Sequence, residues 1–157
     1  MLAIDTIFRN EVDIAKYLFN RQGALSFQIN LYLSDNNVIP VCFEPEGNGD
    51  VDEDTEAKRK QFANIKQTWL ETIKALIKKE GYDVRAISMI SEIYLKENDT
   101  IIIGDGLQVN LWTKDTRRNW VAVVDRYSRE IEKEDIGDEV VSRWDKDIQA
   151  LLKEEVK

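Results

Sequence analysis

An alternating segment near the N-terminus restricts the fold of this chain more than any other part of the sequence. Apolar residues occupy every second position from Leu25 to Leu33, with mostly polar residues between them. Such alternation is typical of a β-strand that buries one face. The turn-forming run Asp35-Asn36-Asn37 comes next, and a second apolar segment follows it. These residues predict a β-hairpin, and hairpins favour an antiparallel sheet.

The register of this hairpin follows from keeping its apolar residues on one face. A loop at residues 35–37 pairs Leu31 with Val41, whereas a shorter loop sets apolar residues against polar ones. Pro40 then lies on the other face, and we expect its strand at the sheet edge because proline has no amide hydrogen. Cys42 lies in the same strand. As the single cysteine it cannot form an internal disulfide, and a buried, inert thiol is expected.

The rest of the chain predicts an α+β fold. Helical periodicity occurs in three segments, residues 5–21, 55–80 and 138–155. Strand patterns occur in three further segments, residues 85–95, 107–113 and 119–127. The first of these strands is apolar on both faces and should lie centrally. We expect an antiparallel sheet of about five strands in the order α-ββ-α-βββ-α, with the helices packed mainly on one face.

Length and charge narrow the class of protein. A chain of 157 residues suits a single globular domain, here with an acidic loop at residues 46–54. The N-terminal residues are charged and lack the apolar stretch of a secretion signal. No segment approaches the roughly 18 consecutive apolar residues of a membrane span. We therefore expect a cytoplasmic protein that binds no membrane. The net charge of −8 argues against nucleic acid as a partner.

Neither a cofactor nor a metal is expected from the motifs. Asn48, Asp50, Asp52 and Asp54 alternate like calcium ligands, but the glycine and glutamate that complete a calcium loop are missing. A solvated loop that favours the start of the following helix explains these charges better. The run 104–106, Gly-Asp-Gly, precedes a strand, whereas a phosphate-binding loop precedes a helix.

Two short motifs accompany the predicted elements. Lys58-Arg59 lies near the start of the second helix, and Ser91-Glu92-Ile93-Tyr94 lies in the central strand. With these motifs, the segment 24–127 resembles a family of uncharacterised proteins from bacterial and phage genomes. The resemblance implies the same order of elements and no established activity. The sequence departs from the family at residues 98–106, where the family carries a connection with proline and arginine.

Three carboxylates are candidates for chemistry. Glu92 lies in the middle of a strand that reads as buried, where an unpaired carboxylate is costly. Asp105 and Asp125 lie near the ends of neighbouring strands. A shared magnesium ion would make these residues the centre of a small metal-dependent hydrolase. The favoured interpretation of Glu92 is a structural ion pair or exposure at an edge.

The tip of the second hairpin is the main candidate for binding. Its predicted register sets Trp112 opposite Trp120, beside Arg117 and Arg118. Aromatic and cationic side chains together are typical of protein interfaces, although cross-strand tryptophans also stabilise hairpins without binding anything. The preferred hypothesis is a non-enzymatic protein-interaction module of bacterial or viral origin. The hydrolase and an acidic inhibitor that imitates nucleic-acid charge are the alternatives, and self-association stays open.

Overall fold

The computed structural model describes residues 3–23, 25, 27–42, 56–97, 101–125, 127–136 and 145–153. Within them the elements follow in this order: α1 (Ile4–Gln22), β1 (Gln28–Leu33), β2 (Val38–Cys42), α2 (Glu56–Glu80), β3 (Val84–Glu97), β4 (Ile101–Trp112), β5 (Arg117–Asp125), β6 (Glu130–Ile136) and α3 (Asp145–Lys153). The α+β class predicted from the sequence is confirmed. None of the helices in this part of the chain is both long enough and apolar enough to span a membrane.

The strands form one open antiparallel sheet in the order β2-β1-β3-β4-β5-β6. The apolar strand β3 lies inside the sheet, and β2, which contains Pro40, lies at one edge, both as predicted. The other edge is β6, which the sequence analysis missed. Its sequence EIEKEDI is mostly charged, since an edge strand in contact with solvent needs few apolar residues.

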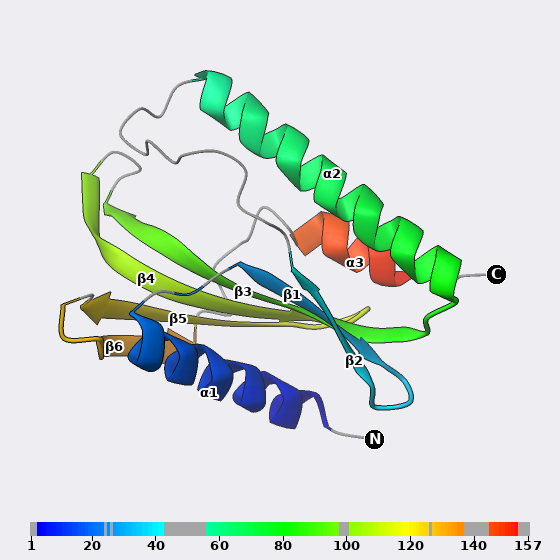
Figure 1. Cartoon of the computed structure of the whole chain (residues 1–157), viewed down its shortest axis with the longest axis horizontal. Helices are drawn as coiled ribbons and strands as arrows, with labels where there is room; N and C mark the ends of the chain where they lie inside the picture. Colours follow the sequence, from blue (N-terminus) through cyan, green and yellow to red (C-terminus); the bar gives the residue numbers. More distant parts are fainter. Residues whose placement is uncertain are drawn as a thin grey trace.

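Helices cover both faces of the sheet (Figure 1). Helices α2 and α3 lie on one face, whereas α1 lies on the other. Side chains of β3 alternate accordingly, with Ala86 and Ile90 in the core beneath α1 and Ile87 and Met89 in the core beneath α2 and α3. Two of the three described helices share one face, as predicted, and α1 adds a second core on the other face of the sheet.

The first hairpin keeps a three-residue loop but forms it one residue earlier than predicted. Leu33 donates its amide to the Asn37 carbonyl (2.9 Å) and accepts from the Asn36 amide (3.1 Å). Asn36 has a left-handed backbone (φ 70°), which asparagine tolerates better than most residues. Leu31 therefore pairs with Ile39, and the predicted pairs are wrong by two positions. A two-residue shift keeps every side chain on its predicted face.

The second hairpin also differs from the predicted register, with a larger consequence. Trp112 pairs with Arg117 rather than lying opposite Trp120. The turn is closed by Thr113 and Thr116, whose backbone groups bond at 2.9 Å and whose hydroxyls lie 2.6 Å apart. The predicted register is wrong by three positions, and an odd shift exchanges the faces of a strand. The two tryptophans therefore lie on opposite faces of the sheet.

Two glycines that follow helices provide a matched pair of substitutions. Gly23 after α1 and Gly81 after α2 are both left-handed (φ 71° and 65°). A Cβ at Gly23 would lie 3.1 Å from Nε of Arg129, whereas no described atom lies within 4 Å of one at Gly81. We expect alanine at Gly81 to lower the free energy of unfolding by about 1 kcal/mol through backbone strain. Alanine at Gly23 should cost more, because Arg129, which donates to the Arg21 carbonyl, must move.

Urea denaturation of the two alanine variants side by side checks this prediction. An equal loss of unfolding free energy at Gly23 and Gly81 would show that the contact with Arg129 adds nothing to the backbone strain.

Candidate binding groove

The four residues of the predicted binding tip are divided between the two faces of the sheet. Trp112 and Arg117 lie on the face of α2 and α3, and Arg118 and Trp120 lie on the face of α1. Trp112 is fully buried and donates its indole hydrogen to Oδ1 of Asp145 (2.8 Å). Nε of Arg117 lies 2.9 Å from the same oxygen. Both residues therefore connect the sheet to α3, and Trp112 has no surface left for a partner.

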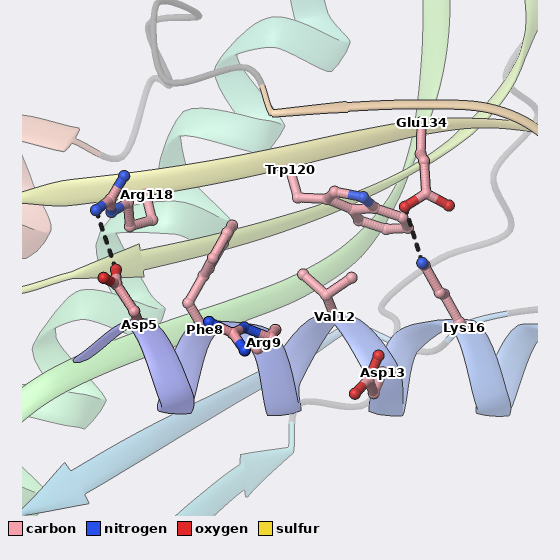
Figure 2. A pocket seen from close by; sticks show the side chains of 9 residues that line it. All are labelled: Asp5, Phe8, Arg9, Val12, Asp13, Lys16, Arg118, Trp120 and Glu134. Atoms are coloured by element: carbon pink, nitrogen blue, oxygen red, sulfur yellow. Dashed lines mark hydrogen bonds and ion pairs between the residues drawn. The ribbon is translucent and has the colours of Figure 1, made fainter. Parts of the chain in front are cut away.

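Arg118 and Trp120 line a groove of about 370 Å³ between α1 and the strands β5 and β6 (Figure 2). Its apolar floor consists of Phe8, Val12 and Trp120. Its charged rim consists of Asp5, Arg9, Asp13, Lys16, Arg118 and Glu134. Each floor residue is no more than 9% exposed, so only the edges of these side chains reach the groove. We call this site the α1 groove.

Two ion pairs cross the α1 groove and connect the helix to the sheet. Nη2 of Arg118 lies 3.0 Å from Oδ1 of Asp5, and Nζ of Lys16 lies 2.8 Å from Oε1 of Glu134. Figure 2 shows them on either side of the floor residues. Nζ of Lys16 also lies 5.7 Å from the ring centroid of Trp120, within reach of a cation–π interaction. The ion pairs are part-exposed, so each contributes little stability.

Arg9 and Asp13 are the remaining charges of the rim. Neither makes an ion pair or a hydrogen bond with the part of the chain that the structure describes. Both side chains are exposed, and they lie four residues apart on α1. The rim thus offers one cation and one anion that a ligand could neutralise.

The floor contains an unsatisfied donor. Nε1 of Trp120 is buried and has no hydrogen-bond partner among the described residues. A buried donor without an acceptor costs about 1–3 kcal/mol. Because the atom is buried, this cost falls on the stability of the fold and not on a ligand contact.

A buried carboxyl lies where α1 contacts β1 and β3. Glu11 of α1 is fully buried, and both of its carboxyl oxygens accept from Nδ2 of Asn30 on β1 (3.1 and 3.3 Å). The hydroxyl of Ser88 on β3 lies near it, without a hydrogen bond of standard geometry in the described structure. Burial raises the pKa of Glu11 to about 7, and the interactions with Asn30 and Ser88 offset only part of this rise. The contact between α1 and the sheet therefore contains a group that titrates near neutral pH.

The structure does not bring the three candidate carboxylates together. Glu92 accepts from the Leu25 amide (2.6 Å), and Asp125 accepts from the Tyr127 amide (2.8 Å) in the turn before β6. Strand alternation places Glu92 and Asp105 on the face of α1 and Asp125 on the opposite face. Among the described residues, no cluster of three or more acidic, cysteine or histidine side chains could hold a metal ion.

Sequence reasoning missed the part of the groove that α1 contributes. Glu11 follows Ile7 by one turn and so falls within the apolar stripe of the helix, which is a signal of a buried carboxyl. Arg9, Asp13 and Lys16 share one side of the helix by their spacing. Nothing in that spacing reveals which strand lies opposite, because Asp5 and Arg118 are 113 residues apart.

No protein-family model, curated protein or solved structure matches the chain. The resemblance of segment 24–127 to uncharacterised bacterial and phage proteins therefore stays a prediction. The acidic loop at residues 46–54 and the side chains of Cys42, Lys58 and Arg59 lie outside the residues whose placement is described.

Proposed function

We propose that the protein is a non-enzymatic interaction module that binds a segment of a partner protein in the α1 groove. The observation that carries this proposal is the charged rim of the groove, in which Arg9 and Asp13 lack partners within the described structure. Trp120 in the floor is only 3% exposed, so it contributes an edge to this contact and the charges of the rim contribute most of it.

The balance of charges in the rim favours a protein over nucleic acid. The three cations of the rim are matched by three carboxylates. A phosphate backbone would meet as many repulsive groups as attractive ones, whereas binding of nucleic acid depends on clustered cations. A peptide can carry charges of both signs and can therefore complement such a rim.

The Arg9→Glu substitution tests this proposal. Arg9 is exposed and makes no ion pair or hydrogen bond with the described residues, so the variant should keep its stability and lose its partner. The measurement is affinity purification from host lysate, with quantitative mass spectrometry of the proteins retained by wild type and variant.

Lys114→Glu is the matched control. It makes the same change of charge at the exposed tip of the β4–β5 hairpin, away from the groove. Partners that are lost with Arg9→Glu and kept with Lys114→Glu support the groove. Partners kept by Arg9→Glu would exclude it, and loss only with Lys114→Glu would return the contact to the hairpin tip.

A further inference from the structure

We propose that the partner segment carries one carboxylate and one cation about 6 Å apart, which pair with Arg9 and Asp13 respectively. This inference rests on the proposed function of the α1 groove. It goes further by naming the chemistry of the partner and the direction in which the segment lies along α1.

The ion pairs within the rim determine which of its charges a partner can neutralise. Asp5 and Arg118 neutralise each other, as do Lys16 and Glu134. Arg9 and Asp13 stay without a partner among the described residues. A segment that contacts the rim meets one net positive and one net negative point, and unlike charges at those points are favourable.

The floor of the groove makes these charges more important for specificity. Phe8, Val12 and Trp120 are each no more than 9% exposed, so the floor offers little apolar surface to a ligand. A buried apolar anchor, which dominates many interfaces, therefore has little room here. Recognition must depend mainly on the rim, and it should weaken as salt screens the exposed charges.

The geometry of α1 sets the spacing and the direction. Residues four apart on a helix are separated by about 6 Å along its axis. Side chains two apart on a strand span about 6.6 Å, and side chains four apart on a helix again span about 6 Å. The partner should therefore carry its acid and base at one of these spacings. Its carboxylate lies toward the N-terminal end of α1, where Arg9 precedes Asp13.

Selection from a displayed library of random peptides tests the inference. We expect wild type to enrich peptides with Asp or Glu two or four residues from Lys or Arg. Synthetic copies should bind Arg9→Ala and Asp13→Ala about fivefold more weakly by fluorescence polarisation. They should also shift the indole N–H resonance of Trp120 in wild type. The double variant Arg9→Asp with Asp13→Arg should instead favour peptides in which acid and base are exchanged.

The outcomes separate this inference from the proposed function. Two results would overturn the partner chemistry and leave the groove as a binding site. In the first, the peptides that shift the Trp120 resonance lack the charge pair. In the second, these peptides bind Arg9→Ala and Asp13→Ala as tightly as they bind wild type. Enriched peptides that leave Trp120 unmoved would overturn both. Failure to enrich any peptide counts against both as well.

Discussion

The Glu11→Gln variant is expected to be more stable than wild type by about 3 kcal/mol at pH values near 8 and by almost nothing near pH 4. Glu11 is fully buried, and its pKa rises from 4.5 to about 7 in the folded protein. Glutamine has nearly the same shape and keeps an oxygen for the Asn30 donor. Glutamine carries no charge at any pH, so the variant avoids the free-energy cost of burying an ionised group.

The direction of the pH effect follows from where the proton is held. Between pH 4.5 and about 7 the folded protein keeps the Glu11 proton, whereas the unfolded chain has lost it. Because the folded state binds more protons, the free energy of unfolding falls as pH rises through this window. Below the window Glu11 contributes no penalty. Above the window Glu11 is ionised in both states and the penalty is complete.

Urea denaturation of wild type and variant across this pH range measures the effect. Glu134→Gln is the control. Glu134 is a part-exposed carboxylate on the same face of the sheet as α1, so this substitution should change the free energy of unfolding by less than about 1 kcal/mol. Curves for wild type and Glu11→Gln that stay parallel from low to high pH would contradict the raised pKa.

The second large effect is expected at Trp112. Its side chain is fully buried in the core beneath α2 and α3 and bonds to Asp145 of α3. Trp112→Ala should cost about 3–5 kcal/mol through the cavity that it leaves. Trp112→Phe keeps most of the apolar contact but removes the donor, and it should cost about 1–3 kcal/mol because the bond is to a carboxylate. Thermal unfolding followed by circular dichroism measures both losses.

A double-mutant cycle separates the hydrogen bond from the packing. Trp112→Phe and Asp145→Ala each remove one partner of the bond, so each should destabilise, and together they should cost less than the sum. Strict additivity would show that the bond at 2.8 Å contributes nothing. If the Trp112→Phe variant folds and still binds the partner protein, Trp112 has a structural role, which agrees with binding in the α1 groove.

The order of apolar and polar residues predicted most helices and strands, because this order reflects which side chains of the same segment are buried. Alternation from Leu25 to Leu33 was sufficient for β1, and the apolar faces of β3 placed that strand inside the sheet. The strand β6 carries no such pattern, because most of its described side chains are exposed at the edge of the sheet. The first half of β4, from Ile101 onward, was mistaken for a connection because Gly104 and Gly106 are typical of turns.

The candidate site was harder to predict because it depends on contacts across the chain. The turn that Thr113 and Thr116 close sets the register of the hairpin and with it the faces that Trp112 and Trp120 occupy. An error of three positions brought together two tryptophans that the sheet separates. The two sides of the groove, α1 and β5, lie about 100 residues apart in the sequence, and side-chain spacing holds no information about such pairs.

The edges of the sheet bear on how the protein behaves when it is concentrated. A sheet that does not close on itself leaves unpaired amide and carbonyl groups along its outermost strands, and these can recruit strands from neighbouring molecules into fibrils. In this protein β2 is five residues long and is interrupted by Pro40, which has no amide hydrogen to offer. At the opposite border the charged residues of β6 would repel the same strand of a second copy. The protein is thus built against edge-to-edge aggregation, and any association between copies should use another surface.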